Sequence, residues 1–282
     1  MTVKIVTDST SYLPEELKDK YDIKVVSLNI TMNGKSYKEV EIDNKKFYEE
    51  MEASKEIPTS SQPALDEMIN TFENILSEGF DIAAIFLSSE MSGTFSSAHL
   101  VKEMVLENYP DRKIEIIDSK TNCMQMGFEV LEAAKSAKEG KSLEEVKEAA
   151  LYVRENSRFL FAPDSLTYLK KGGRIGGAAA LFGSILQIKP ILTVEKGVTT
   201  VFDKVRTKKK AVNTMVEKVL KDAEERGIRG ITVHHINCEE EGKALAEILR
   251  EKLKVEVHVE KIGPVIGLHV GPGSIGVAYY TK

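Results

Sequence analysis

The side chains best suited to chemistry in this chain begin with a loop of small hydroxyl residues. Residues 88–94 are Ser-Ser-Glu-Met-Ser-Gly-Thr, directly after an apolar run at 82–87 and directly before helix-forming residues from Phe95. The apolar run predicts a buried strand, so the segment is expected to join a strand to a helix. Such a loop offers unpaired backbone N–H groups and hydroxyl donors, which suit a carboxylate or a phosphate. Alternatively, Ser92 only caps the helix, because serine is common at that position.

Three further segments carry the same kinds of side chain. Residues 7–11 (Thr-Asp-Ser-Thr-Ser) and 118–121 (Asp-Ser-Lys-Thr) each follow an apolar run, and residues 58–63 (Pro-Thr-Ser-Ser-Gln-Pro) precede an expected helix. Asp8 and Asp118 are expected to brace their loops by accepting backbone N–H bonds. Because the carboxyl ends of parallel strands share one edge of a sheet, these loops together predict a ligand site there.

Composition excludes several classes of function. No histidine or cysteine lies in these loops, and Cys123 and Cys238 are far apart, so neither a metal site nor a cofactor is expected. The net charge of −5 argues against a nucleic-acid partner. The first residues indicate a strand rather than a signal peptide, and no uncharged run reaches the roughly 18–20 residues that span a bilayer. We expect a soluble, cytoplasmic protein without a transmembrane segment.

One uncharged stretch is long enough to be notable. Residues 175–188 contain no charged side chain and several glycines. The stretch is too short to span a bilayer, so a core helix is the simpler interpretation. The glycines also allow a mobile apolar lid beside a hydrophobic ligand.

The first half of the chain alternates short apolar runs with helix-like segments. Uninterrupted runs rich in Val and Ile are typical of strands buried on both faces, and they occupy residues 3–7, 23–30, 82–88 and 113–119. Helices between such strands indicate parallel crossovers. Further helices are expected at 124–138 and, after a capping box at Ser142 and Glu145, at 142–156. We predict an N-terminal three-layer α/β/α domain, residues 1–157, with a mainly parallel sheet.

The pattern changes in the second half. Residues 189–194 and 198–202 flank Glu-Lys-Gly, which predicts a hairpin. Valines alternate with polar residues over 255–260, as in a strand with one wet face. Other strands are expected at 231–236 and 276–281, and helices at 208–226 and 239–253. These elements predict a C-terminal two-layer α/β domain, residues 158–282, with a mixed or antiparallel sheet.

Basic and glycine-rich segments of the second half are candidates for contact with an anion. Residues 170–174 are Lys-Lys-Gly-Gly-Arg, residues 204–210 hold five basic side chains, and residues 267–273 place His269 just before a glycine turn. A solvated surface and a structural histidine are the simpler interpretations. However, an acidic protein that concentrates Lys and Arg in loops is expected to meet an anion there.

An ordered set of motifs gives the chain a family resemblance. The motifs are TDST at 7–10, TSSQP at 59–63, SSEMSGTFSSA at 88–98, IDSK at 117–120, LTYLKKGGRI at 166–175, KPIL at 189–192, DKVRTKKKA at 203–211 and GPVIGLHVGPGSIG at 263–276. With these motifs the chain resembles the DegV family. Characterised bacterial members of that family bind fatty acids and serve as the acyl-presenting subunit of a fatty acid kinase.

The resemblance implies a non-enzymatic carrier that holds one acyl chain in a buried apolar tunnel. The ligand would be a long-chain fatty acid such as palmitate, stearate or oleate, and the partner would be the catalytic subunit of the kinase, with a role in phospholipid metabolism. A transient membrane contact is compatible with this role. The resemblance places the carboxylate near Ser92, Gly93, Thr94, Ser60 and Ser61. It places Arg174, Arg206 and His269 near the head group and the kinase. Candidates for the tunnel wall are Met124, Met126, Leu181, Phe182 and Leu186.

Two other functions remain open from the residues alone. A lipid or acyl-ester hydrolase would use Ser92 as nucleophile, His269 as base and Asp118 to orient the base. Against it, the chain has no Gly-x-Ser-x-Gly elbow. A binding protein for a small phosphate ligand would use the same edge of the parallel sheet, although no P-loop sequence is present.

Overall fold

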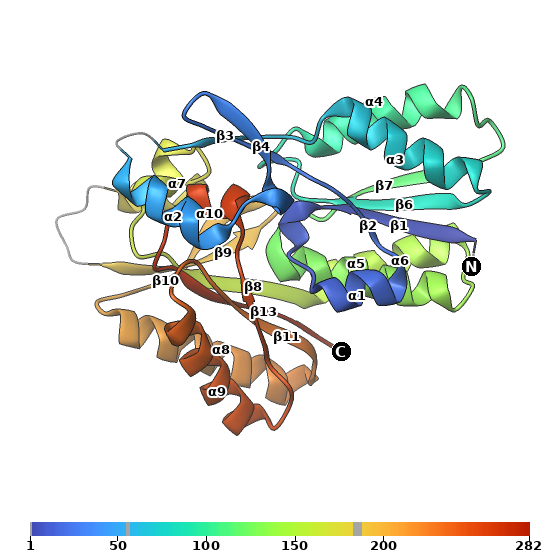
Figure 1. Ribbon diagram of the computed structural model, residues 1–282. Coiled ribbons are helices and arrows are strands. Elements are labelled where there is room, and N and C mark those ends of the chain that lie inside the picture. The colour runs from blue at the N-terminus through green and yellow to red at the C-terminus, as the bar shows by residue number, and fades with distance from the viewer. Residues whose placement is uncertain (1, 55–56, 183–187) are drawn as a thin grey trace.

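A computed structural model of the protein describes residues 2–54, 57–182 and 188–282 (Figure 1). Its first sheet, sheet A, has four parallel strands in the order β2-β1-β6-β7. The strands are β1 (Val3–Asp8), β2 (Lys24–Val26), β6 (Asp81–Phe86) and β7 (Ile114–Asp118). The two central strands, β1 and β6, are almost fully buried because helices cover both faces of the sheet, which explains their uninterrupted apolar runs.

Each face of sheet A has its own helices. On one face, α3 (Leu65–Ser77) and α4 (Thr94–Leu106) pack against β6 and β7 and enclose a core that includes Phe72, Phe86 and Val101. On the other face lie α5 (Cys123–Lys138) and α6 (Leu143–Asn156), with α1 (Glu15–Tyr21) packed on α5. The predicted capping box is present: Ser142 and Glu145 satisfy each other's backbone N–H groups at the start of α6.

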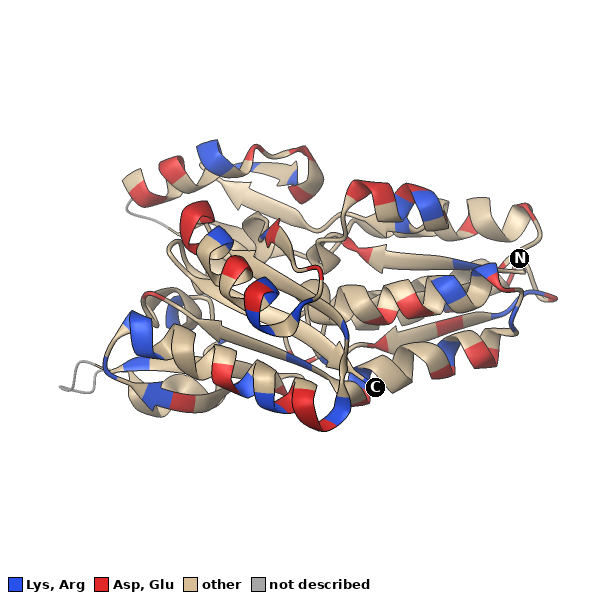
Figure 2. Cartoon of the chain, turned by 90° about the horizontal axis from the view of Figure 1, so that it is seen from below, with Lys and Arg blue, Asp and Glu red and all other residues tan. Residues whose placement is uncertain are grey.

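The second sheet, sheet C, has six strands in the order β10-β9-β8-β13-β11-β12, antiparallel except for the β11–β12 pair. The strands are β8 (Ser157–Ala162), β9 (Lys189–Glu195), β10 (Val198–Val205), β11 (Ile228–His235), β12 (His258–Lys261) and β13 (Ile275–Thr281). Its outer face is covered by α8 (Lys208–Arg226) and α9 (Glu239–Leu253), whose outer surfaces carry many of the charges seen in Figure 2. Its inner face packs on α5 and α6.

The helices α5 and α6 therefore form a layer between the two sheets (Figure 1). The largest core cluster includes Ile5 of sheet A, Val130 of α5 and Phe159 of sheet C. The expected class, a mixed α/β protein with one parallel and one mixed sheet, is confirmed. The division into domains at residues 157 and 158 stays a prediction. Helices α5 and α6 contact both sheet A and sheet C.

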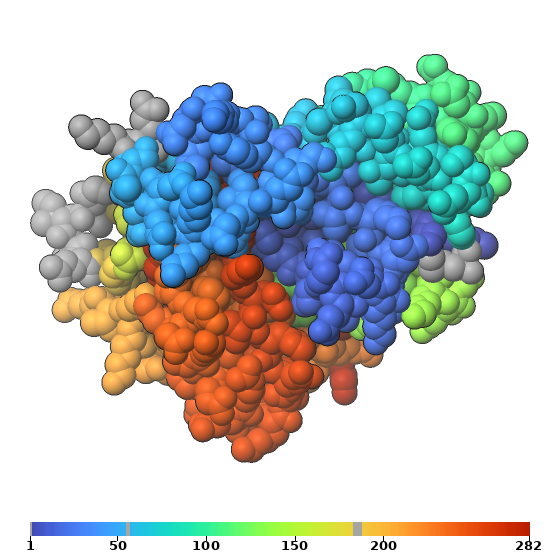
Figure 3. Space-filling model, in the orientation of Figure 1, coloured from blue at the N-terminus to red at the C-terminus, as the bar shows by residue number. Residues whose placement is uncertain are grey.

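A third, small sheet connects the two halves. It has the order β4-β3-β5 and is antiparallel, with strands β3 (Asn29–Met32), β4 (Lys35–Lys38) and β5 (Thr59–Ser61). Between β4 and β5 lie the 3-10 helix η2 (Glu39–Glu41) and α2 (Asn44–Ala53). Helix α10 (Pro264–Val270) packs against α2, β3 and α7 (Thr167–Lys171). Figure 3 shows the corresponding blue segment lying against the orange and red C-terminal half.

The structure corrects several expected bounds. The run 23–30 is two strands, because β2 joins sheet A while β3 joins the small sheet. The expected strand at 255–260 begins only at His258. Just before it, the carbonyl of Val257 accepts two hydrogen bonds from the guanidinium of Arg250, at 3.1 and 2.6 Å.

Two short 3-10 helices complete the description, η1 (Ser9–Ser11) and η3 (Gly176–Leu181). A core helix over 175–188 is wrong for the described part of that stretch, since η3 buries Ala178 alone; residues 183–187 lie outside the described residues. Within the described chain, no helix combines the length and the apolar character needed to cross a membrane.

Candidate ligand-binding cavity

A cavity of about 470 Å³ lies between the carboxyl edge of sheet A and the inner face of sheet C. Most of its wall is apolar. The side chains that form this part come from six separate regions of the chain and include Leu28, Leu87, Met91, Phe159, Phe161, Leu169, Val194, Ile236, Ile262, Val265, Ile266, Val270 and Ile275. A cavity of this size with an apolar wall and a few polar groups is typical of a site for a small, largely apolar molecule.

Polar side chains gather at one end of the cavity. They are Ser60, Ser61, Gln62, Ser92, Arg174 and His269, accompanied by Gly93. Ser61, Gln62, Gly93 and Arg174 are exposed, whereas Phe159, Ile236 and Ile275 in the wall are buried. The polar end therefore reaches the surface, and the apolar part lies in the interior.

Two aspartates brace the loop that carries Ser92, as the sequence predicts. The carboxylate of Asp8 accepts from the backbone N–H groups of Leu87, at 2.8 Å, and Thr10, at 2.9 Å. The carboxylate of Asp118 accepts from the backbone N–H and hydroxyl of Ser89, at 3.2 and 2.6 Å. Complete burial raises the pKa of Asp8 to about 6 despite these bonds. These contacts fix the loop at the carboxyl end of β6.

The Ser92 side chain both lines the cavity and helps to start helix α4. Its Oγ lies 2.9 Å from the hydroxyl of Thr94 and accepts from the backbone N–H of Thr94 at 3.3 Å. Thr94 itself is fully buried and does not line the cavity. A Cβ at Gly93 would stand 2.4 Å from Oε1 of Gln62, so a side chain there would displace the exposed Gln62 amide.

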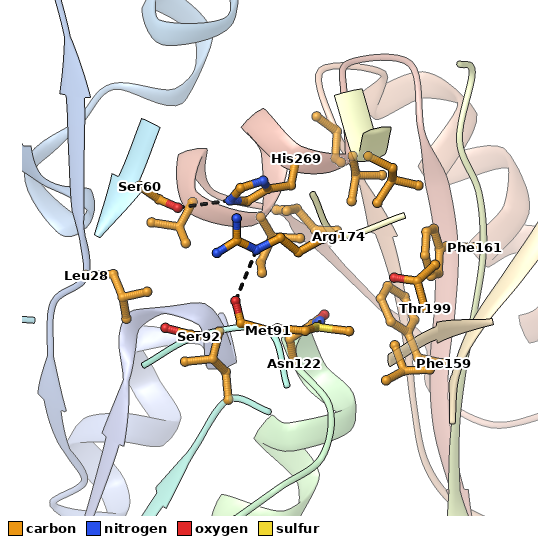
Figure 4. Close-up of a pocket in the computed structure, with 18 of the residues that line it drawn as sticks. Leu28, Ser60, Met91, Ser92, Asn122, Phe159, Phe161, Arg174, Thr199 and His269 are labelled. Carbon is orange, nitrogen blue, oxygen red and sulfur yellow. Dashed lines mark hydrogen bonds between the residues drawn. The ribbon is translucent and has the colours of Figure 1, made fainter. Parts of the chain in front are cut away.

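His269 and Arg174 form the centre of the polar end (Figure 4). His269 Nε2 lies 2.9 Å from the hydroxyl of Ser60, and its buried Nδ1 has no hydrogen-bond partner within the described chain. Arg174 donates from Nε to the carbonyl of Met91, 3.1 Å away, and from a terminal nitrogen to that of Gly172, 2.5 Å away. Burial, and secondarily the Arg174 charge, lower the pKa of His269 to about 4. The imidazole is therefore neutral at pH 7.

The groups of the alternative hydrolase are not assembled. His269 Nε2 is hydrogen-bonded to the hydroxyl of Ser60, and the hydroxyl of Ser92 is hydrogen-bonded to that of Thr94. The Asp118 carboxylate is used by Ser89 and by the backbone N–H of Lys120. Since a triad requires a continuous chain of hydrogen bonds from nucleophile to base to acid, this geometry gives the hydrolase hypothesis no support.

The phosphate-ligand hypothesis also lacks a suitable turn. Residues 271–276 are Gly-Pro-Gly-Ser-Ile-Gly, which matches the Gly-x-Gly-x-x-Gly pattern in letters. In this fold the segment follows helix α10 and enters strand β13. A dinucleotide-binding turn instead follows a strand and opens a helix, so the match has the wrong context. The described residues contain no group of three or more His, Cys, Asp or Glu placed to hold a metal ion.

Other candidate residues lie away from the cavity wall. Met126 is completely buried in the core, and Met124 borders a separate pocket against β11. Leu181 and Phe182 do not line the cavity either; Phe182 is 38 % exposed and lies under the ammonium group of Lys170. Leu186 lies outside the described residues. Arg206 is exposed between β10 and α8 and is not a lining residue.

Sequence reasoning missed much of the apolar wall. Phe159 and Phe161 lie two residues apart on β8 and point to the same face, so the period of two in this segment was a usable signal. Asn122, a polar lining residue, follows the fourth hydroxyl-rich segment directly. No sequence signal marks Leu28 as a wall residue, because it lies between two strands of different sheets.

The fold and the cavity define an α/β protein whose two main sheets enclose a largely apolar ligand site with a polar mouth. The chain belongs to the DegV family: a family model described as an uncharacterised protein of that family matches residues 2–282. The resemblance inferred from the motifs is thereby confirmed.

Relatives and similar solved structures cover all or nearly all of the chain. A DegV domain-containing protein of Clostridium acetobutylicum is 56 % identical over 282 residues, 100 % of this chain and 99 % of that protein. The crystal structure of DegV from Bacillus subtilis, described as a fatty acid binding protein, is 36 % identical with a TM-score of 0.90 and full coverage of both chains. A stearic acid-binding protein from Eubacterium ventriosum is 28 % identical with a TM-score of 0.91, covering 99 % and 98 % of the two chains.

Proposed function

We propose that this protein binds one long-chain fatty acid, such as palmitate, stearate or oleate, with the tail in the cavity and the carboxylate at its polar end. The observation that carries the proposal is the buried apolar wall that ends in hydroxyl groups and an arginine at the surface. The fatty-acid-binding descriptions of the similar Bacillus subtilis and Eubacterium ventriosum structures support it.

The tail would supply most of the affinity. Burying one methylene contributes about 0.8 kcal/mol, so a chain of about fifteen gains roughly 12 kcal/mol before the costs of ordering and association are subtracted. The polar end would then fix the orientation of the ligand and disfavour uncharged lipids. Within this proposal, the hydroxyls of Ser92, Ser60 and Ser61 and the backbone at Gly93 donate to the carboxylate.

We further propose that the protein presents this carboxylate to the catalytic subunit of a kinase in the cytoplasm and does not itself catalyse a reaction. A carboxylate oxygen would attack the γ-phosphorus of ATP, giving an acyl phosphate and ADP. Arg174 lines the polar end of the cavity and would stabilise the charge on the transferred group, and the neutral His269 would donate or accept one hydrogen bond. Exposed Arg206 would contact the partner.

The first experiment is native mass spectrometry of the purified protein, followed by extraction under denaturing conditions. A co-purifying fatty acid, or stoichiometric uptake of added palmitate, stearate or oleate, is expected because of the large apolar contribution. A protein that is empty and takes up none of the three would refute the fatty-acid proposal. Thermal stabilisation by ATP instead of oleate would favour the phosphate-ligand alternative.

The position of the carboxylate is tested by Ser92→Ala, with Ser96→Ala, an exposed serine of the following helix α4, as the matched control. Ser92→Ala removes one donor, and about tenfold weaker oleate binding or slower phosphorylation is expected. Ser96→Ala should resemble the wild type. Equal affinity and turnover in all three proteins would place the carboxylate elsewhere.

The kinase proposal is tested by Arg206→Gln, with exposed Arg229→Gln on the opposite part of sheet C as control. Arg206→Gln is expected to keep the oleate affinity and to lower the rate of acyl phosphate formation with the kinase. Loss of oleate binding in Arg206→Gln would contradict this division of roles.

A further inference from the structure

A side-chain amide lies in the wall of the cavity and has no structural task there. Asn122 lines the cavity, and only 5 % of its surface is exposed. Its Nδ2 lies 3.2 Å from the thioether sulfur of Met91, a weak acceptor, and its Oδ1 has no hydrogen-bond partner among the described residues. The amide therefore has unused hydrogen-bonding capacity at a site away from solvent.

The usual structural reasons for a buried asparagine do not apply to Asn122. It occupies the N-cap position of α5, yet its side chain makes no capping hydrogen bond. The neighbouring polar groups already have partners: the hydroxyl of Thr121 donates to Oε1 of Gln125 at 2.5 Å, and Nε2 of Gln125 donates to the hydroxyl of Ser157 at 3.1 Å. An apolar side chain at this position would avoid the cost of burying an unpaired amide.

A second buried polar residue of the cavity lies on strand β10 of sheet C. Thr199 lines the same cavity and is 3 % exposed. Figure 4 shows Asn122 beside Met91, between Ser92 and Phe159, and Thr199 next to Phe159 and Phe161. The apolar interior thus contains polar atoms beyond the carboxylate end.

We propose that the preferred ligand is a hydroxylated long-chain fatty acid and that Asn122 recognises its chain hydroxyl. The inference rests on the fatty-acid binding proposed above and names the class of ligand for the same cavity. A hydroxyl both donates and accepts, so it can pair with the amide whichever of Oδ1 and Nδ2 points toward the ligand. In a wall without such a partner, a hydroxyl on the tail would weaken binding, because it would lose its hydrogen bonds to water.

The test compares stearate with a series of hydroxystearates that carry the hydroxyl at different carbons, measured by calorimetry on the full chain. The wild type is expected to bind at least one isomer about tenfold more tightly than stearate. In Asn122→Leu, which has a similar size and no hydrogen-bonding group, this preference should disappear while stearate affinity is retained. Asn213→Leu, the same change at an exposed asparagine of α8 outside the cavity wall, should keep the preference.

The possible outcomes separate this inference from the proposed function. If stearate binds but no hydroxystearate binds more tightly to the wild type, the inference is overturned without any variant being needed. If the preference persists in Asn122→Leu, Asn122 is not the recognition residue and the inference is likewise overturned. If neither stearate nor any isomer binds the wild type, the proposed fatty-acid binding fails.

Discussion

Gly172 lies directly against the imidazole of His269. A Cβ at residue 172 would stand 2.2 Å from His269 Nδ1, so glycine is needed for this close approach. Gly173 has a different role, since its φ of +72° is a backbone conformation that favours glycine. The paired glycines of the basic turn thus bring Arg174 and His269 together at the cavity mouth. Close packing against His269, and not backbone flexibility, explains the glycine at position 172.

We predict that Gly172→Ala disturbs the polar end of the cavity. The added methyl group must push the imidazole away from Ser60 or move the turn, which should lower the free energy of unfolding by about 1–3 kcal/mol. The same change at Gly177 meets its nearest atom at 3.7 Å, an ordinary contact, and is the control. Urea unfolding measures the stabilities, and the NMR signals of His269 report the ring. Equal stability and unchanged His269 signals in Gly172→Ala would show that the turn adapts without cost.

At the scale of elements, most helices and strands could be predicted from the sequence, because the sequence patterns that mark them are local. The helices α8 and α9 have the expected bounds, 208–226 and 239–253, since caps and hydrophobic periodicity are properties of short segments. The hairpin of β9 and β10 was predicted from its Glu-Lys-Gly turn for the same reason. The split of 23–30 was not predicted, because the two strands follow each other closely in sequence and only their partner strands distinguish them.

The cavity was only half accessible from sequence. Ser60, Ser92, Arg174 and His269 line one cavity, and the resemblance had grouped them near the head group. The methionines of α5 do not line the wall. Helix α5 is buried on nearly all sides between two sheets, so its composition cannot indicate which face borders a cavity. Wall residues come from distant segments, and their meeting depends on the packing of whole sheets.

A buried carboxylate joins the small sheet to helix α10. Glu39 is 5 % exposed; its Oε2 accepts from the hydroxyl of Ser9 at 2.5 Å, and its Oε1 accepts from the hydroxyl of Tyr12 at 2.9 Å and the backbone N–H of Val265 at 2.8 Å. Burial raises the pKa of Glu39 to about 7, and the nearby Asp8 acts in the same direction. The contact holds α10, and with it His269, in place over the cavity.

This contact predicts a specific dependence of stability on pH. The folded protein keeps the Glu39 proton up to about pH 7, whereas the unfolded chain releases it near 4.5, so stability falls as pH rises between these values. The difference between the pKa of Glu39 in the folded protein and in the unfolded chain corresponds to about 3 kcal/mol in the free energy of unfolding. Glu39→Gln, which stays neutral, should remove this part of the dependence, and exposed Glu41→Gln is the control.

The comparison must be made between proteins, because other groups titrate in the same range. Asp8, with a pKa of about 6, also lowers the stability as pH rises, as Glu39 does. His234 and His269, with pKa values of about 4, act in the opposite direction: they lower the stability as pH falls below 6.5. The stability difference between Glu39→Gln and wild type, measured by urea unfolding from pH 4.5 to 8, isolates Glu39. A difference that is constant across this range would contradict the raised pKa.

At the scale of the whole molecule, the two halves share their central layer. The hydroxyl of Tyr280 on β13 donates to Glu132 of α5 at 2.8 Å, and His234 of β11 accepts from the backbone N–H of Met124 at 3.1 Å. The inner face of sheet C, including Phe159, is covered by α5. Residues 158–282 alone would expose this face and also lose one wall of the cavity.

We therefore predict that the isolated segment 158–282 does not fold cooperatively. Without α5 and α6 the apolar inner face of sheet C would contact water, and its burial is a large share of the driving force for folding. Circular dichroism should show no sharp thermal transition for 158–282, a single transition for the full chain, and recovery of a transition when 1–157 and 158–282 are co-expressed and purified together. A cooperative transition of 158–282 alone, near that of the full chain, would show that the C-terminal half is an independent domain. In that case the ligand site would lie between two domains that are free to move apart. If 158–282 does not fold alone, the shared layer holds both walls of the cavity in one folding unit. Ligand entry then requires local movement at the mouth of the cavity.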